Sequence, residues 1–250
     1  MAKAPKQRAD QLVVARGLAA SRSRAQALIM AGEVYAGTRR VAKPGEQLAA
    51  DAALTLKGRD HPWVSRGGCK LAAALETFGV DPGGATAADL GASTGGFTDV
   101  LLQHGAARVY AIDVGYGQLA GTLRQDPRVV VLERTNARYL TAAQVPEALD
   151  LIVCDASFIG LETLLPAPLA LAAPGARLIA LIKPQFEVGR GEVGKGGVVR
   201  DPGQHDAVCA RIGDWLAARP GWSVQGLTRS PVTGSEGNAE FLVLAGRDAG

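Results

Sequence analysis

The segment Asp89-Leu90-Gly91-Ala92-Ser93-Thr94-Gly95-Gly96-Phe97-Thr98-Asp99 constrains the fold of this chain more than any other. The apolar residues at 85–90 predict a buried strand, and the apolar residues after the glycines follow a helical spacing, so the glycines lie at a strand-to-helix turn. Without Cβ atoms, the backbone of such a turn can bend tightly and approach a ligand closely. The segment therefore predicts a ligand site within an α/β sheet.

An alternation of strands and helices continues from this turn almost to the end of the chain. Apolar runs predict strands at 85–90, 108–112, 129–132, 149–154, 177–182, 222–228 and 240–245. Helical spacing predicts helices at 97–104, 116–125, 159–172 and 204–218, and one before the sheet that begins near Gly67 with Ser65 as its cap. Such alternation is typical of a mostly parallel sheet covered on both faces, which binds ligands at the carboxyl ends of its strands.

The glycine turn also indicates the kind of ligand. Its sequence, G-x-S-T-G-G, lacks the G-x-G-x-x-G spacing that cradles a pyrophosphate, but Asp113 follows about twenty residues later, where such units place the carboxylate for a ribose. This combination favours a cofactor that contains adenosine and no pyrophosphate, with S-adenosylmethionine as the leading candidate. On the turn alone, a nucleotide or a packing turn without a ligand remains an alternative.

The positive charge of the chain is concentrated at one end. Residues 1–60 hold 11 Lys and Arg against 5 Asp and Glu, whereas residues 61–250 hold 16 against 19. Basic residues that neutralise phosphates release condensed counterions, so this end is a candidate surface for a nucleic acid, and a merely solvated appendage is the alternative. Helical spacing at 10–16 and 21–32, followed by short strand-like runs, predicts a small module with little core of its own.

Composition bears on the compartment and on metals. The three cysteines, Cys69, Cys154 and Cys209, are widely spaced, which suits reduced thiols and matches no metal-ligand pattern. The three histidines share no spacing that indicates zinc. No run of 18 apolar residues occurs, and the basic N-terminus precedes no apolar segment. We therefore expect a cytoplasmic monomer that binds neither a metal nor a membrane.

Three segments of the basic module carry a recognisable pattern. They are Arg8-Ala9-Asp10-Gln11-Leu12, Ser21-Arg22-Ser23-Arg24-Ala25 and Ile29-Met30-Ala31-Gly32-Glu33-Val34. Together they resemble the S4 RNA-binding module, which implies a domain at 1–58 that docks on structured RNA, with a linker at 59–65 before a second domain at 66–250. The candidate RNA contacts of the module are Arg8, Arg16, Arg22, Arg24, Arg39, Arg40 and Lys43.

Four ionisable residues lie where predicted elements begin or end. Asp155 and Lys183 each follow an apolar run, Glu240 precedes one, and Lys70 lies at the start of the helix before the sheet. Parallel strands would bring Asp155 and Lys183 to the edge that holds the glycine turn, and a final antiparallel strand would bring Glu240 there. Charged residues on apolar strands are costly unless they are paired or functional. The four residues predict either a catalytic group or two structural ion pairs.

Longer segments identify the second domain. They are 65–71 (Ser-Arg-Gly-Gly-Cys-Lys-Leu), 89–98, 113–119 (Asp-Val-Gly-Tyr-Gly-Gln-Leu), 133–138, 181–187 (Leu-Ile-Lys-Pro-Gln-Phe-Glu) and 237–241. Residues 63–245 resemble the FtsJ-like methyltransferases, and the whole chain resembles the TlyA-type ribosomal RNA 2′-O-methyltransferases, a group that also carries the name haemolysin. The resemblance implies a Rossmann-like S-adenosylmethionine-dependent methyltransferase sheet, mostly parallel with an antiparallel last strand. It places Lys70, Asp155, Lys183 and Glu240 on the family's K-D-K-E catalytic set.

This chemistry asks for these residue types. A ribose 2′-hydroxyl is a poor nucleophile, so a base must take its proton as the oxygen attacks the sulfonium methyl group. We expect Lys183 to be that base, Lys70 to be a neighbouring cation, and the two carboxylates to orient both amines. The residues expected to hold S-adenosylmethionine are Gly91, Ser93, Gly95, Gly96, Asp113 and Asn136. The glycine-rich segment 187–203 is either a mobile loop, whose Arg190 and Lys195 join Arg66 in contacting RNA, or a plain linker.

The resemblance implies a cytidine of 16S or 23S ribosomal RNA as the substrate, and ribosomal RNA or ribosomal subunits as the partner. Two other classes of function are alternatives to a methyltransferase. One is a membrane-lysing protein, as the haemolysin name implies, and the other is a non-catalytic RNA-binding or ribosome assembly factor. The sequence holds no apolar span and no strongly amphipathic basic helix, which disfavours the first. The complete K-D-K-E set disfavours the second.

Overall fold

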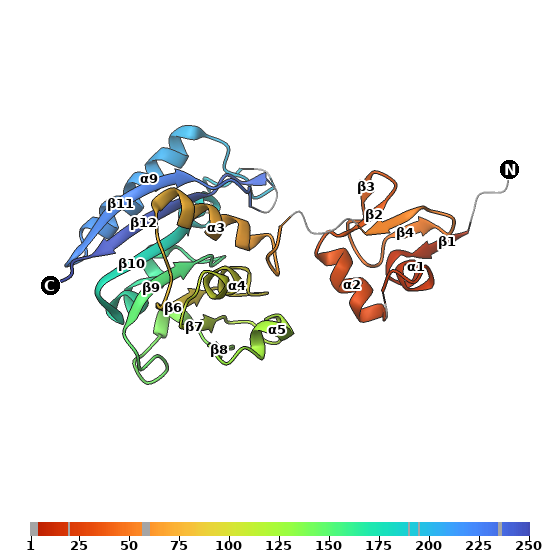
Figure 1. The fold of residues 1–250 in the computed structure, drawn as a ribbon. Coiled ribbons are helices and arrows are strands. Elements are labelled where there is room, and N and C mark those ends of the chain that lie inside the picture. The colour runs from red at the N-terminus through yellow and green to blue at the C-terminus, as the bar shows by residue number, and fades with distance from the viewer. Residues whose placement is uncertain (1–4, 20, 57–60, 190, 195, 235–236) are drawn as a thin grey trace. The chain divides into compact units, whose positions relative to one another are not determined.

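The computed structural model describes residues 5–19, 21–56, 61–189, 191–194, 196–234 and 237–250, which fall into two compact units divided between Pro62 and Trp63 (Figure 1). Part of the expected linker at 59–65 lies outside the described residues. Its last residues belong to the larger unit, because Trp63 and Val64 pack against a core of that unit. The backbone N–H of Val64 also donates to Asp99 Oδ2 at 2.7 Å.

The small unit combines two helices with two small sheets. Its helices are α1 (Ala9–Ala15) and α2 (Arg22–Met30), and its strands are β1 (Lys6–Arg8), β2 (Val34–Ala36), β3 (Arg39–Arg40), β4 (Gln47–Ala49) and β5 (Leu54–Leu56). β1 pairs with β4, and β2 lies between β3 and β5. Ser21 caps α2 by accepting a hydrogen bond from the N–H of Arg24, and Gly17 and Gly32 follow the two helices with positive φ. These boundaries confirm the two helices that the sequence predicted.

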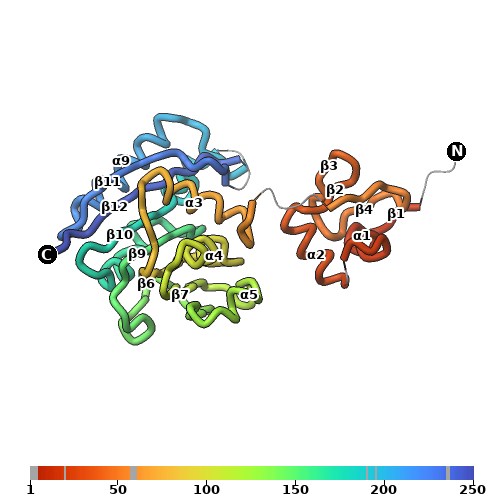
Figure 2. The backbone as a smooth tube through the Cα atoms, in the orientation of Figure 1, coloured from red at the N-terminus to blue at the C-terminus, as the bar shows by residue number. Residues whose placement is uncertain are grey.

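The larger unit is built on one seven-stranded sheet. Its strands are β6 (Thr86–Leu90), β7 (Arg108–Ile112), β8 (Val129–Leu132), β9 (Leu149–Cys154), β10 (Ala172–Ile182), β11 (Trp222–Arg229) and β12 (Phe241–Arg247). Their order is β11-β12-β10-β9-β6-β7-β8, and Figure 2 shows four of them, β10, β9, β6 and β7, next to one another. Five neighbouring strands run parallel, and β12 is antiparallel to both of its neighbours. The expected sheet, mostly parallel with an antiparallel last strand, is confirmed.

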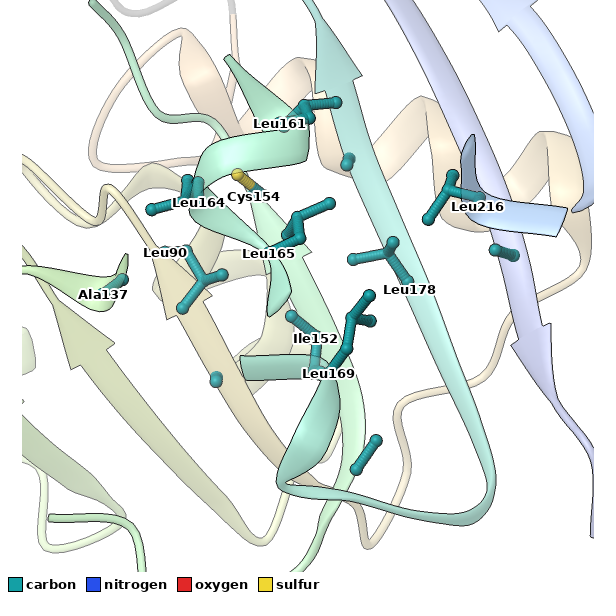
Figure 3. Close-up of a cluster of buried hydrophobic side chains, with 14 of the residues drawn as sticks. Leu90, Ala137, Ile152, Cys154, Leu161, Leu164, Leu165, Leu169, Leu178 and Leu216 are labelled. Carbon is teal, nitrogen blue, oxygen red and sulfur yellow. The ribbon is translucent and has the colours of Figure 1, made fainter. Parts of the chain in front are cut away.

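Helices cover both faces of this sheet. Residues of α3 (Gly67–Phe78), α4 (Gly96–Gln103) and α5 (Gly121–Arg124) pack on one face. Residues of α6 (Leu161–Leu164), α7 (Pro166–Ala170) and α9 (Pro202–Ala217) pack on the other. Figure 3 shows leucines of α6 and α7 beside strand residues such as Ile152 and Leu178. Successive residues of each central strand enter opposite clusters, which explains why these strands read as continuous apolar runs.

Three local predictions are wrong. The helix expected at 116–125 is only the short α5, because the chain before it turns with the N–H of Gly117 bonded to Glu133. The helix expected at 159–172 is divided into α6 and α7, since Pro166 starts a new helix, and the chain enters β10 already at Ala172. Ser65 does not cap α3 with its side chain; the N-cap position is Arg66.

The strand pairing decides which residues meet at one edge of the sheet. β9 and β10 run parallel, so Asp155 and Lys183, which follow them, leave the sheet at the same edge. Ile182 pairs with Phe241 in the antiparallel β10–β12 ladder, which brings Glu240 to this edge as well. Within the described ranges, the structure holds no helix with the length and apolarity that crossing a membrane requires.

Candidate active site

Two lysines and two carboxylates form a continuous ion-paired chain at this edge. Lys183 Nζ lies 2.6 Å from Asp155 Oδ1, and Lys70 Nζ lies 3.3 Å from Asp155 Oδ2. Lys70 Nζ also lies 2.7 Å from Glu240 Oε2. The four side chains are only 3–18% exposed. The order Glu240, Lys70, Asp155, Lys183 alternates charge, so each buried charge has an opposite neighbour.

Lys183 is the last residue in this series of ion pairs. Its amine also has hydrogen-bond partners in the segment after β9. Its Nζ donates to Ser157 Oγ at 3.0 Å and to the backbone carbonyl of Asp155 at 3.3 Å. These two hydrogen bonds add to the ion pair with Asp155 Oδ1 and hold Nζ on the side of the segment after β9. The exposed Ser157 lines the adjoining cavity, so Lys183 reaches that cavity beside a hydroxyl group.

A cavity of about 520 Å³ opens beside the ion-paired chain. All four ionisable residues line it, together with residues of the glycine turn and of the segments after β9 and β10. Its lining includes Arg66, Lys70, Gly91, Ser93, Gly96, Asp155, Ser157, Lys183, Phe186 and Glu240. The structure thus brings the glycine turn and the four ionisable residues together around one space.

Two glycines of the turn have no room for a side chain. Gly91 has φ +83°, and a Cβ there would lie 2.9 Å from the Cα of Ala156. A Cβ at Gly96 would meet Ser65 Oγ and would lie 2.8 Å from the backbone nitrogen of Gly68. The turn therefore keeps its bare backbone against the cavity because neighbouring segments occupy the other side.

Asp89 lies beneath the turn and anchors the helix that follows it. Its Oδ2 accepts hydrogen bonds from the N–H and Oγ1 of Thr98, at 2.9 and 2.7 Å. Its Oδ1 is buried and has no hydrogen-bond partner among the described residues. Burial raises the pKa of Asp89 to about 7, although the two Thr98 hydrogen bonds oppose the shift.

Asp113 joins the glycine turn to the turn after β7. Its Oδ2 accepts from the N–H of Ser93 at 2.8 Å, and its Oδ1 accepts from the N–H of Gly115 at 2.7 Å. A carboxylate has about four lone-pair sites, so each oxygen keeps one for a ligand hydroxyl. Ser93 lines both the main cavity and a smaller one that Asp113 borders.

The other expected cofactor residues lie elsewhere. Gly95 packs toward Leu119 and Leu123 and is not part of the main cavity lining. Asn136 accepts a hydrogen bond from the N–H of Arg138 and caps the 3-10 helix η1 (Ala137–Tyr139). A turn-forming role accounts for this asparagine.

The basic residues expected to contact RNA differ in their surroundings. Arg16, Arg22, Arg24, Arg39, Arg40, Lys43 and Arg66 are exposed, and Arg8 is half-buried. Arg8 and Arg22 both hydrogen-bond to the fully buried Asp10, and with Gln26 they hold the pKa of that carboxyl well below its usual range. Arg39 pairs with Glu46 at 2.6 Å. Arg190 and Lys195 lie outside the described residues.

An aromatic pair beside the cavity was not predicted from the sequence. Phe158 is 89% exposed and has φ +66°, an uncommon conformation for a residue with a side chain. Its ring centre lies 5.0 Å from that of Phe186, which lines the cavity. The only sequence signal is position, since the two rings follow Asp155 and Lys183 by three residues each.

Comparisons with known proteins identify the families of the two units. Residues 63–247 match the model of the FtsJ-like methyltransferases, and residues 7–53 match that of the S4 domain. The chain is 50% identical to YqxC of Bacillus subtilis, whose name assigns it to the rRNA methyltransferases, over 95% of this chain and 85% of that protein. It is 49% identical to the 16S/23S rRNA (cytidine-2′-O)-methyltransferase TlyA of Mycobacterium tuberculosis, over 94% of this chain and 88% of that protein. A solved structure of a hemolysin-named protein from Streptococcus thermophilus has a TM-score of 0.75 and 41% identity, covering 98% of this chain and 89% of that one.

Proposed function

Because the chain belongs to the FtsJ-like methyltransferase family and carries an S4 domain, we infer that it moves a methyl group from S-adenosylmethionine to the 2′-hydroxyl of a cytidine in ribosomal RNA. The observation that carries this proposal is the chain of alternating charges from Glu240 to Lys183, placed beside the glycine turn. The relative from M. tuberculosis, whose name states this reaction, is similar over nearly the whole length of both proteins.

The residues of the turn fit the proposed methyl donor. S-adenosylmethionine supplies a methyl group already activated by a sulfonium centre. Asp113 keeps lone pairs free for the two ribose hydroxyls, and its backbone partners fix the direction of the carboxylate. Gly91 and Gly96 present backbone to the cavity without side chains, which suits close approach of a ligand.

In the proposed reaction, the Lys183 ammonium first gives up one proton to solvent, and the neutral amine that results then takes the proton of the 2′-hydroxyl. The ribose oxygen forms a bond to the methyl carbon as the bond from that carbon to sulfur breaks, and the proton passes to the Lys183 amine. Asp155 and Ser157 hold the amine at the cavity, at 2.6 and 3.0 Å. Lys70 balances the Asp155 carboxylate and is held in turn by Glu240. Alignment of oxygen and methyl group accounts for much of the rate in such transfers.

RNA recognition is proposed to involve both units. The exposed ring of Phe158, packed against the half-buried ring of Phe186, offers a face for a nucleobase, as aromatic residues do for unstacked bases. Arg66 lines the cavity and is exposed, which suits a phosphate contact. The exposed arginines of the S4 domain supply a basic surface for structured RNA. We propose that a monomer acts in this way on ribosomal RNA or ribosomal subunits in the cytoplasm.

The test is direct methyl transfer. Purified protein and labelled S-adenosylmethionine are incubated with small subunits, large subunits and free ribosomal RNA from cells that lack this gene. Ribose methylation is then mapped in the RNA. Incorporation at cytidine 2′-oxygens supports the proposal; incorporation into a base, or none in any substrate, contradicts it.

A liposome leakage assay, run in parallel, tests whether the protein lyses membranes, as the name of the hemolysin-named relatives implies. Dye release by the wild-type protein and equally by Lys183→Ala, with no RNA methylation, would favour a membrane-lysing function instead.

A further inference from the structure

A buried carboxylate joins two of the segments that line the cavity, the one after β9 and the one after β10. Glu187 ends α8 (Pro184–Glu187), the short helix that follows Lys183, and its side chain is only 4% exposed. Its Oε1 accepts a hydrogen bond of 2.8 Å from the N–H of Leu161, the first residue of α6. The carboxylate also lies over Gly160, where a Cβ would be 3.2 Å from Glu187 Oε2. Glu187 thus connects the chain after β10 with the chain after β9.

An arginine of α9 holds this connection from the other side. Arg211 Nη2 donates to Glu187 Oε2 at 3.1 Å and to the backbone carbonyl of Glu187 at 2.9 Å. Its Nη1 lies 2.6 Å from Oε1 of Glu162 in α6. One guanidinium therefore contacts both segments, and the longest helix of the unit serves as their common support.

The connected segments carry groups of the proposed reaction. The segment after β9 holds Ser157, which accepts from Lys183, and the exposed Phe158. The segment after β10 holds Lys183 itself and Phe186, whose ring lies against Phe158. Neither aromatic ring is among the buried core residues. The segments are linked by partly buried residues on a shared core, such as Ile159 and Val188, and directly by the hydrogen bond from Leu161 to Glu187.

We propose that Glu187 and Arg211 are positioning residues for methyl transfer, which align the RNA nucleotide at the Phe158–Phe186 pair with the amine of Lys183. This inference rests on the proposed function and adds to it two residues that contact neither substrate. Stability alone does not explain this buried carboxylate, because burying its charge costs free energy that the ion pair with Arg211 only partly recovers. Its value in this place is the fixed geometry it gives to two loop segments.

Glu187 and Arg211 together are called the clamp. The test compares variants of the clamp with a matched control. Glu187→Ala removes the acceptor for Leu161 and the partner of Arg211, whereas Glu187→Gln keeps an acceptor for Leu161. Arg211→Met removes the guanidinium. The control is Arg128→Met, because Arg128 is 42% exposed, as Arg211 is 41% exposed. Arg128 also pairs with a carboxylate, Asp126, and donates to a backbone carbonyl. It lies before the start of β8, the outermost strand, and therefore away from the carboxyl ends of the strands where the cavity lies.

We expect Glu187→Ala and Arg211→Met to lower kcat between about tenfold and a hundredfold, because small misplacement of reacting groups has effects of this size. KM for the RNA rises, while the Kd for S-adenosylmethionine stays within about twofold of the wild-type value. Glu187→Gln recovers part of the lost kcat. Arg128→Met lowers the melting temperature by a similar amount and leaves kcat and KM unchanged.

The inference is overturned if the clamp variants, assayed well below their melting temperatures, keep wild-type kcat and KM. It is also overturned if Arg128→Met loses as much activity, or if the affinity for S-adenosylmethionine falls in parallel. RNA affinity by filter binding is measured for every variant as a second readout. If the wild-type protein methylates no ribosomal RNA, the proposed function fails, and unchanged RNA affinity in the clamp variants would then overturn this inference separately.

Discussion

Replacing Asp89 with asparagine is expected to change how the stability of the methyltransferase unit depends on pH. Asp89 is buried beneath the glycine turn, and burial raises its pKa from 3.8 to about 7. A carboxyl whose pKa rises on folding binds its proton more tightly in the folded state. Its contribution to stability is therefore full below pH 3.8 and is lost as the pH rises through about 7.

The size of the effect follows from the two pKa values. Each unit of difference corresponds to roughly 1.4 kcal/mol, so the wild-type protein loses stability on the order of 2 to 3 kcal/mol from this group between about pH 5 and pH 8. Asparagine does not titrate in this range, and its Oδ1 can still accept the two hydrogen bonds from Thr98. The free energy of unfolding of Asp89→Asn, relative to wild type, is therefore expected to rise by an amount on the order of 2 to 3 kcal/mol over this interval.

Urea unfolding followed by tryptophan fluorescence measures this difference. All three tryptophans, Trp63, Trp215 and Trp222, belong to the larger unit, so the signal reports that unit. Asp126→Asn is the control: hydrogen bonds from Arg128 lower the pKa of Asp126, so it remains charged throughout and its difference from wild type stays constant. Parallel curves for wild type and Asp89→Asn would refute the reasoning, because they would mean that Asp89 takes up no proton in this range.

Two further predictions concern the cofactor and the RNA. Asp113→Ala is expected to raise the Kd for S-adenosylmethionine by about tenfold or more, since hydrogen bonds to a charged group are lost. RNA affinity should not fall comparably. An unchanged Kd for S-adenosylmethionine, measured by calorimetry, would count against the role of Asp113 in binding the ribose. Phe158→Ala is expected to raise KM for the RNA by about tenfold through lost base stacking, whereas Phe158→Tyr stays near wild type; equal KM values for all three proteins would show that no base stacks on this ring.

The convergence of three of the four ionisable residues could be predicted from the strand pattern of the sequence. Residues after parallel strands leave the sheet at one edge, so Asp155 and Lys183 were expected together, and an antiparallel last strand adds Glu240. Lys70 comes from a helix outside this rule, and its position was expected only from the family resemblance. Helix boundaries were predicted less well. Because residues 159–172 are apolar with helical spacing, they were expected to form one helix, whereas a second helix begins at Pro166.

Other features depend on contacts that the sequence does not show. The positive φ of Phe158 belongs to a loop whose ends are fixed by Lys183 and Glu187, distant in the chain. Likewise, a count of basic residues cannot distinguish an arginine free to meet RNA from Arg8, which is occupied with the buried Asp10. Side-chain pairing of this kind requires the backbone of both partners to be placed first.

The proton transfer to Lys183 is the central claim, and single-turnover methyl transfer to ribosomal RNA tests it most directly. The Lys183→Ala protein is expected to lose methyl transfer by at least about a hundredfold, as loss of a general base does. Its affinities for S-adenosylmethionine and RNA should remain close to wild type. Transfer at the wild-type rate by Lys183→Ala, with the methyl group still on the cytidine 2′-oxygen, would contradict the account.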